Sequence, residues 1–411
     1  MHHASNTMAQ NSTKIPFWRD TRVLQVLFQI LFLLGVFLLA GILYANMLKG
    51  LDNLGLNLKL DFLRNEAGFD VSDTVIEYDP SNTYLKAFIV GVLNTLRVSL
   101  LGILCATVLG LFIGISRLST NWLVRNIAAT YIEIFRNIPL LLQILFWYTV
   151  FGSLPAARES INLFDTVFIN NRSIYFPSLQ QTAGISSWVG YFYAAAILSV
   201  ISIFVLALIF HRKQVERMEE GDDIGYFTHV TRAAKWSIVP VFFIVAIIGW
   251  FLAPESPFVL GRPELQRFNV EGGIRFSAGF ISLLIALSVY TSAFIAEVVR
   301  SGIQAVSKGQ REAARAVGLS TGQTLRLIIL PQAVPIIIPP LTSQYLNLAK
   351  NSSLATAAGY DDLFRIGSTI LTQAGKAIPV FAMVMANYLI ISLTTSAAMN
   401  WYNRWVNRFN R

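Results

Sequence analysis

Five of the polar side chains within or beside the long apolar stretches of this sequence are candidates for functional groups. They are Glu133, Arg136, Glu297, Asn347 and Lys350. Burying an ionisable group in a membrane-like stretch is costly, so such residues are candidates for a solute path or gate. The first three lie near the ends of their stretches, where long side chains reach water at low cost. A structural role at a helix end therefore stays open for them.

Other kinds of reactive site are not expected. Cys105 is the only cysteine and lies inside an apolar run, which excludes a disulfide framework or a thiolate metal site. His211 and His229 have no partners at ligand spacing, which argues against a membrane-embedded enzyme. The chain has no Gly-x-x-x-x-Gly-Lys-Ser/Thr run to bind nucleotide phosphates, so we expect no cofactor in this chain.

The composition is that of a membrane protein. Hydrophobic residues make up 54% and charged residues 13%, with a mean hydropathy of +0.55. Soluble domains carry about 25% charged residues, too many for this chain to match. In a membrane protein, the distribution of the Lys and Arg behind the net charge of +9 sets the orientation, and no nucleic-acid partner is expected. The first apolar run is too long for a cleavable signal peptide.

The apolar runs predict an all-α, polytopic membrane protein with about eight transmembrane helices. The expected spans are 23–46, 88–116, 127–151, 188–210, 236–253, 277–298, 330–348 and 378–400. The seventh should be kinked or start late, because four prolines crowd its beginning. Gly110 and Gly114 form a small-xxx-small pattern, which we expect to pack helices within this chain.

An even number of spans places both termini on one side of the membrane. Lys and Arg are more frequent on the side of the termini, which predicts a cytoplasmic segment 1–22 and tail 401–411. The outer loops are then 47–87, 152–187, 254–276 and 349–377. The second and third of these loops contain no catalytic-looking cluster.

The segment 307–331 is a structured cytoplasmic loop. Ser307 and Gln310 form one capping-box pattern, and Ser320 and Gln323 form a second. Gly318 can adopt the left-handed conformation that ends the first helix. We therefore expect two short helices joined at an angle.

The first of these helices carries small side chains, Ala313 and Ala314, flanked by Arg311 and Arg315. Small side chains let another backbone approach closely, and flanking charges can orient the contact. The residues alone allow either a docking surface for another protein or packing against the rest of this chain.

The loop resembles the EAA signature of ABC-importer permeases. Its positions are Glu312, Ala313, Ala314, Gly318, Ile328 and Pro331, with unbroken spacing. The resemblance implies that 299–330 is the coupling loop that docks on a separate ATPase subunit. Glu312 would make a polar contact or cap the helix, the alanines would supply the fit, Gly318 the bend, and Pro331 the passage into the next span.

Further segments are similar to the polar amino-acid branch of that family. They are 91–97, 133–143, 290–300 and 347–354, and the similarity covers 86–151 and 277–400. This part corresponds to a five-helix core. The extra span with its loop, 23–85, and the insertion 152–276 look like those of the general L-amino-acid permeases, the Aap/Bzt type. The chain has Asn137-Ile138 where the branch usually has Gly-Thr.

The resemblance implies an inner-membrane permease subunit of an ATP-driven importer of L-amino acids. Its implied partners are a dimer of ATPase subunits that bind the ATP, a second related permease and a periplasmic amino-acid-binding protein. An ABC permease for another small polar solute remains the alternative. A secondary transporter is the remoter one, since inverted repeats and midplane charges are not evident.

Overall fold

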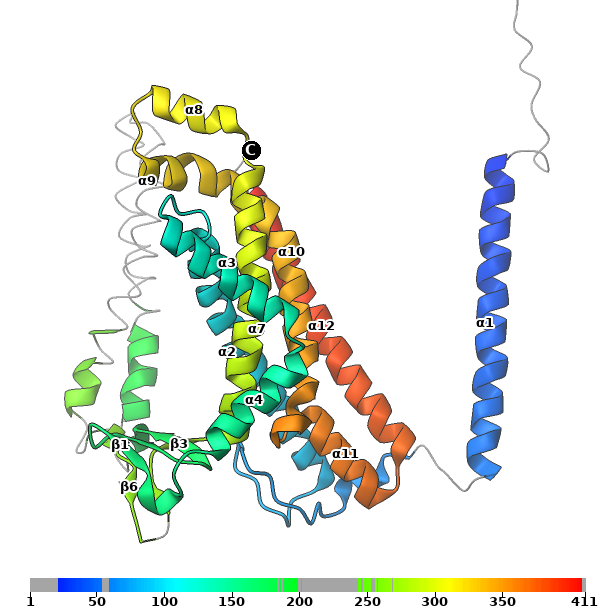
Figure 1. The fold of residues 1–411 in the computed structure, drawn as a ribbon. Coiled ribbons are helices and arrows are strands. Elements are labelled where there is room, and N and C mark those ends of the chain that lie inside the picture. The colour runs from blue at the N-terminus through cyan, green and yellow to red at the C-terminus, as the bar shows by residue number, and fades with distance from the viewer. Residues whose placement is uncertain are drawn as a thin grey trace, which may run out of the picture.

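The computed structural model describes residues 21–53, 59–182, 188–198, 258–267 and 269–408, with positions 185, 201, 243–244, 247–252 and 256. Most of these residues are helical, as predicted. The longer helices are α1 (Thr21–Asn53), α2 (Tyr84–Ser116), α3 (Trp122–Asn137), α4 (Leu140–Gly152), α7 (Ala278–Ala305), α10 (Leu330–Asn351), α11 (Leu363–Ala374) and α12 (Ala377–Arg408). Figure 1 shows two short helices, α8 (Lys308–Ala316) and α9 (Thr321–Thr324), at one end of the bundle and the strands at the other. We name these ends the α8 end and the sheet end.

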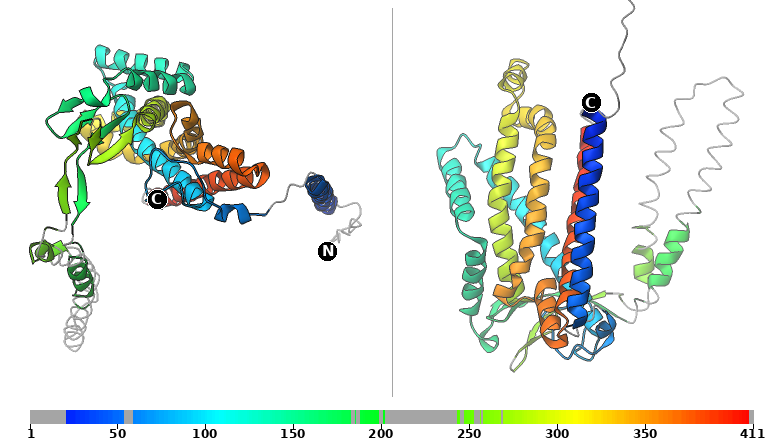
Figure 2. Two further views of the ribbon diagram at one scale, coloured as in Figure 1. Left: turned by 90° about the horizontal axis from the view of Figure 1, so that it is seen from below. Right: turned by 90° about the vertical axis from the view of Figure 1, so that its right-hand side faces the viewer.

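Helices α2 and α7 pack together as the centre of the bundle. Ala and Gly on α2 allow the contact: a Cβ on Gly110 would lie 2.7 Å from Cβ of Ile295, and one on Gly114 would lie 2.8 Å from the carbonyl oxygen of Ala296. The prediction that this glycine pair packs helices within the chain is confirmed. Figure 2 shows α10 beside α7, and both contribute to the same buried core.

The predicted span 127–151 is wrong as a single helix, because it is broken into α3 and α4 with a 103° bend. Pro139 has no N–H to donate, and it disfavours helical geometry at Ile138, whose ψ is 124°. The buried Gln143 amide occupies the break, since its Nε2 donates to the carbonyls of Phe135 (3.1 Å) and Ile138 (3.0 Å). Two backbone carbonyls at the bend are thus hydrogen-bonded by a side chain of this chain.

The seventh predicted span does not start late. A continuous helical segment runs from Thr321 to Ala358, through α9, a π-helical turn (Leu325–Ile329), α10 and a 3₁₀ turn (Ser352–Ala358). Pro335, Pro339 and Pro340 lie inside α10, after Pro331 in its first turn. Pro331, Pro335 and Pro339 are spaced by four residues and share one face, whereas Pro340 lies on another. The π turn just before them absorbs a change in the hydrogen-bond register.

The sheet end contains more structure than the sequence predicted. Two 3₁₀ turns lie here, Asp61–Arg64 and Ala157–Glu159, with strands β1 (Ile161–Leu163), β2 (Val167–Ile169), β3 (Ser173–Phe176), β4 (Ser178–Gln181), β5 (Phe258–Gly261), β6 (Glu264–Leu265), β7 (Val270–Glu271) and β8 (Ile274–Ser277). An antiparallel sheet has the order β1-β2-β3-β8, with β4 paired to β5 and β6 to β7. In β3–β8, Ser173 pairs with Ser277, so this sheet leads directly into α7. Helix α11 also lies here, within a predicted loop.

Five described helices are long and apolar enough to cross a membrane, or six if the α3–α4 pair is one span. Helix α1 confirms the first predicted span, although none of its hydrophobic stretch is buried. The predicted spans 188–210 and 236–253 are only partly covered by the described residues, in which Trp188–Leu198 forms a short apolar helix. The total of eight spans stays a prediction.

Candidate functional site

The α8–α9 turn is a rigid corner at the α8 end. Gly318 has a φ of +83°, the left-handed conformation expected for it. The Ser320–Gln323 capping box forms as predicted, with side chain and backbone bonded in both directions. The box predicted at Ser307 and Gln310 is wrong: helix α8 does follow Ser307, but the side chain makes no capping bond. The Gln310 N–H donates instead to the carbonyl of Ser307 (3.2 Å).

The EAA-like residues are divided between the two faces of this corner. Glu312 and Ala313 are exposed, whereas Ala314 is 4% exposed and faces the chain's own core. Ile328 is half-buried in the π turn, and Pro331 is exposed in the first turn of α10. The residues alone allowed either docking or internal packing for this helix. The structure shows that Ala314 packs internally and that Ala313 faces outward.

Arg311 fastens α8 to the bundle. Its guanidinium Nη2 donates to the carbonyl of Ile303 near the end of α7 (2.7 Å). A pocket of about 680 Å³ lies beneath α8, between Arg311, Phe112 of α2 and Leu325 of the π turn. The corner is therefore held to the bundle at one edge and lies over a cavity.

Glu133, Arg136 and Glu297 were all predicted near the cytoplasmic ends of their spans. In the structure, Arg136 and Glu297 come together. Glu297 forms an ion pair with Arg300 on α7, with Arg300 Nε 2.9 Å from Glu297 Oε2. The charge of Arg136 also acts on Glu297, and the Arg136 guanidinium lies 5.1 Å from the ring centroid of Phe294. Glu133 is exposed on α3 and has no hydrogen bond or ion pair within the described part of the chain.

Asn347 and Lys350 lie elsewhere. Both are exposed near the end of α10 that faces away from α8. They do not meet the Glu297 group, which lies two turns from the opposite end of the bundle. Among the residues that the structure describes, no group of three or more His, Cys, Asp or Glu side chains could hold a metal ion.

A polar network at the sheet end was not predicted from the sequence. The amide of Asn94 on α2 donates to the carbonyls of Asp73 (2.7 Å) and Asp361 (2.8 Å). Asp361 in turn accepts from the backbone N–H of Ser72 (2.8 Å) and pairs with Arg365 (2.8 Å). The adjacent carboxylates Asp361 and Asp362 were a signal in the sequence. Two of the partners of Asp361, Ser72 and Asn94, however, lie more than 260 residues away along the chain.

Asp362 is the buried member of this network. Its carboxylate caps α11 by accepting from the N–H of Arg365 (2.9 Å), and it accepts from the hydroxyl of Tyr388 (3.1 Å). Burial nevertheless dominates and raises the pKa of Asp362 to about 6. The folded protein therefore keeps a proton here at pH values where an unfolded chain, with a pKa of 3.8, has lost it.

We expect Asp362→Asn to reduce the loss of stability between pH 4 and 7. The contribution of this group is fully present below pH 3.8 and is lost as the pH rises through about 6. Asparagine remains neutral and can still accept the Arg365 N–H. The difference in the free energy of unfolding between variant and wild type should therefore grow with pH to the order of 2–3 kcal/mol. Thermal unfolding in detergent at several pH values measures it.

Asp79→Asn is the control for that titration. Asp79 is exposed, and hydrogen bonds from Ser81 lower its pKa, so its contribution is lost as the pH falls. The control should show a small change of opposite sign. Equal pH profiles for wild type and Asp362→Asn would contradict the burial of a titrating carboxyl at this position.

The comparisons with known proteins agree with the architecture. A family described as the binding-protein-dependent transport system inner membrane component matches residues 233–409. The putative amino-acid ABC transporter permease YhdX of Escherichia coli is 45% identical over 383 residues, 92% of this chain and 93% of its own length.

Two further relatives are similar over most of their length. The general L-amino acid transport system permease AapQ of Rhizobium johnstonii is 43% identical over 83% of this chain and 82% of its own. The glutamate/glutamine/aspartate/asparagine permease BztB of Rhodobacter capsulatus is 39% identical over 94% of both chains. Together with the helical bundle and its α8–α9 corner, these similarities show that the chain belongs to the family of amino-acid ABC transporter permeases, which are transport subunits and not enzymes.

Proposed function

We propose that this permease carries L-amino acids into the cell and is driven by a separate ATPase that docks on α8. The observation that carries the docking is the exposed, rigid corner around Gly318. Ala313 presents a small side chain to the outside of that corner, while Arg311 and Ala314 hold it to the bundle. A partner backbone can approach Ala313 closely, and Glu312 beside it supplies a polar contact.

The proposed docking orients the chain in the membrane. An ATPase works in the cytoplasm, so the α8 end and both termini are cytoplasmic, and the sheet end is periplasmic. Helix α2 has 33 residues and is about 50 Å long, so it extends beyond a hydrocarbon core of about 30 Å. The sheet end, built from the loop before α2 and from the insertion, then receives the binding protein.

Transport follows as a shift between two arrangements of rigid helices. ATP bound by the ATPase dimer favours one arrangement and hydrolysis restores the other, because each state binds its ligands with different affinity. A second, related permease completes the path. We assign Glu297 and Arg136, with Glu133 beside them on α3, to a gate near the cytoplasmic end, and Asn347 and Lys350 to the periplasmic end of the path.

The substrate class rests on the relatives. Their printed names include general L-amino acids, and the two acidic amino acids glutamate and aspartate with their amides glutamine and asparagine. Uptake of radiolabelled L-glutamine, L-glutamate and L-leucine into proteoliposomes that contain the assembled transporter tests this class. Uptake without ATP would indicate a secondary transporter instead. Uptake of none of the three amino acids would indicate a different class of solute.

Cross-linking tests the docking surface. Cys105 is the only cysteine of the chain, so Cys105→Ser provides a background without thiols. We expect Ala313→Cys to cross-link to the co-purified ATPase, because this side chain faces outward. Ala314→Cys is the matched control: one residue away and 4% exposed, it should give little or no product. Equal cross-linking at both positions, or none at Ala313→Cys, would contradict the proposed surface.

A further inference from the structure

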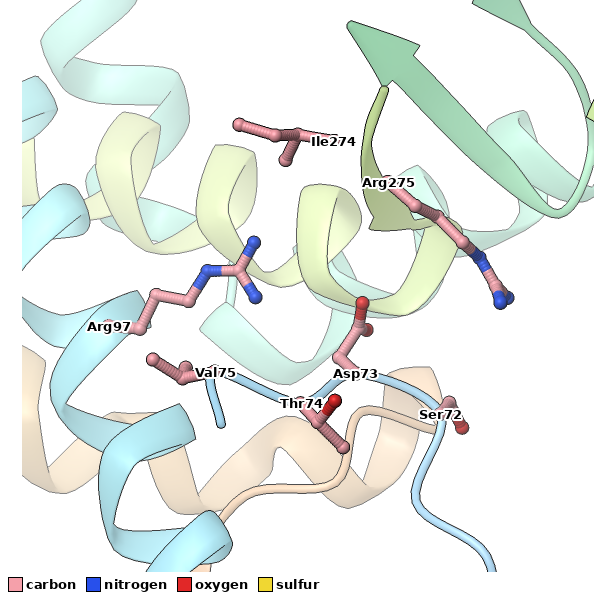
Figure 3. A pocket seen from close by; sticks show the side chains of 7 residues that line it. All are labelled: Ser72, Asp73, Thr74, Val75, Arg97, Ile274 and Arg275. Atoms are coloured by element: carbon pink, nitrogen blue, oxygen red, sulfur yellow. The ribbon is translucent and has the colours of Figure 1, made fainter. Parts of the chain in front are cut away.

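A pocket of about 470 Å³ opens at the sheet end and is not part of the proposed docking surface or gate (Figure 3). It is lined by Arg97 of α2, by residues 72–75 of the preceding loop, and by Ile274 and Arg275 of β8. Its volume lies within the range of about 300–1,000 Å³ that is usual for small-molecule sites. It is placed where the loop, α2 and the start of α7 meet.

Arg97 is held in this pocket without using its hydrogen-bond donors. Its guanidinium carbon lies 4.8 Å from the ring centroid of Phe276 and 4.6 Å from that of Phe280, and the two rings stack with centroids 5.3 Å apart. No hydrogen bond or ion pair joins Arg97 to the rest of the described chain. The aromatic contacts fix the guanidinium while its N–H groups stay available, which suits bidentate binding of a carboxylate.

The depth of Arg97 places it at the mouth of the bundle. Phe276 precedes the first turn of α7, which begins at Ala278. The guanidinium therefore lies level with the start of α7, near the membrane boundary at the sheet end. A ligand bound there is reached from outside the bundle.

The charges around the pocket leave one cation in excess. Asp73 is buried and accepts from the hydroxyl and the backbone N–H of Ser277. Arg275 donates from Nε to the hydroxyl of Ser173 (2.8 Å). Figure 3 shows Arg97 and Asp73 pointing toward the space between them, with Arg275 directed away. The guanidinium of Arg97 can therefore pair with a carboxylate from a ligand.

We propose that this pocket receives the carboxylate of an amino acid as it passes from the binding protein into the permease. The proposal rests on the proposed function. Arg97 binds the carboxylate, and Asp73 across the pocket attracts the ammonium group. Both contacts recognise groups that all α-amino acids share, so they do not discriminate between substrates with different side chains.

Uptake kinetics of the assembled transporter in proteoliposomes test the pocket. The concentration of binding protein loaded with L-glutamine is varied, and the variants are Arg97→Gln and Arg97→Lys. We expect Arg97→Gln to lower the maximal rate about tenfold or more, because a charge-assisted contact with the passing carboxylate is lost. The concentration of loaded binding protein at half-maximal rate should not change. Arg97→Lys keeps the charge but not the bidentate fork, so it should retain an intermediate rate.

The control for charge is Arg64→Gln. Arg64 is an exposed cation at the same end and does not line the pocket, so its loss should leave both parameters at wild-type values. A higher half-maximal concentration for Arg97→Gln with an unchanged maximal rate would overturn the proposal, because Arg97 would then dock an acidic side chain of the binding protein. Unchanged values of both parameters would overturn it as well.

A second variant fills the pocket without altering Arg97. Ile274 is 45% exposed on the opposite wall, so Ile274→Trp is expected to fold and to narrow the space. It should also lower the maximal rate, and normal transport would overturn the proposal. Failure of the wild-type transporter to import any of the three test amino acids would instead refute the proposed function, which keeps the two results distinguishable.

Discussion

Gly318→Val should lower ATP-driven uptake about tenfold or more while the variant still inserts and folds. Gly318 has a φ of +83°, and a Cβ added there would meet no atom within 4 Å. Space is therefore available, and the whole effect comes from the backbone. A β-branched residue in the left-handed region costs on the order of 1–3 kcal/mol, and about 1.4 kcal/mol corresponds to a factor of ten. The turn would relax by reorienting α8 and misplacing Ala313.

Uptake and ATP hydrolysis, measured on the same proteoliposomes, check this result. Gly318→Asn is the matched control, because asparagine adopts the left-handed conformation more readily than other residues with side chains. It should keep most of the transport. Gly322→Val controls for bulk, since Gly322 lies in α9 with open space and an ordinary φ. If Gly318→Val and Gly318→Asn transported equally well, the angle at Gly318 would not matter for coupling.

Gly110→Leu should prevent formation of a stable bundle. A Cβ at this position would lie 2.7 Å from Cβ of Ile295 and 2.9 Å from the backbone oxygen of Ser292. The neighbouring atoms belong to the backbone and to a β-branched side chain, neither of which can turn aside. Helices α2 and α7 would have to separate along the central contact of the bundle. Overpacking of this kind costs about 1–3 kcal/mol or more.

The yield of monodisperse protein in mild detergent and its thermal unfolding temperature measure this effect. Gly41→Leu is the matched control, because Gly41 lies in the apolar helix α1 and a Cβ there meets nothing within 4 Å. It should have no effect on either quantity. A Gly110→Leu variant as stable as Gly41→Leu would show that α2 and α7 are not packed closely at this point.

Local patterns predicted the α8–α9 corner well. A left-handed glycine and a capping box involve residues within a few positions of one another, so their geometry follows from the sequence. Ser307 shows the limit of such patterns. Its side chain competes with its own carbonyl for the N–H of Gln310, and the pattern alone does not decide between them.

Pro139 is also a local signal, but the sequence predicted one continuous span where the structure has a break. Apolar residues continue on both sides of Pro139, so hydropathy alone joins α3 and α4 into one span. The bend is possible because Gln143 donates to the carbonyls that the proline leaves unpaired. Prolines four apart in α10 had the opposite outcome, since they leave the helix continuous. The number and spacing of prolines thus did not determine which helix would break.

By itself, the sequence determined that this is a helical membrane protein, that it has an EAA-like corner, and where most described spans lie. These properties depend on hydropathy and on contacts between near neighbours. The tertiary structure decided which alanine of α8 faces outward, which charges meet, and how the sheet end is built. Asp73 meets Ser277, and Asn94 meets Asp361, at separations of 204 and 267 residues. Hydrogen bonds at such separations depend on the packing of the whole bundle, because no local pattern specifies which distant polar group a buried side chain will reach.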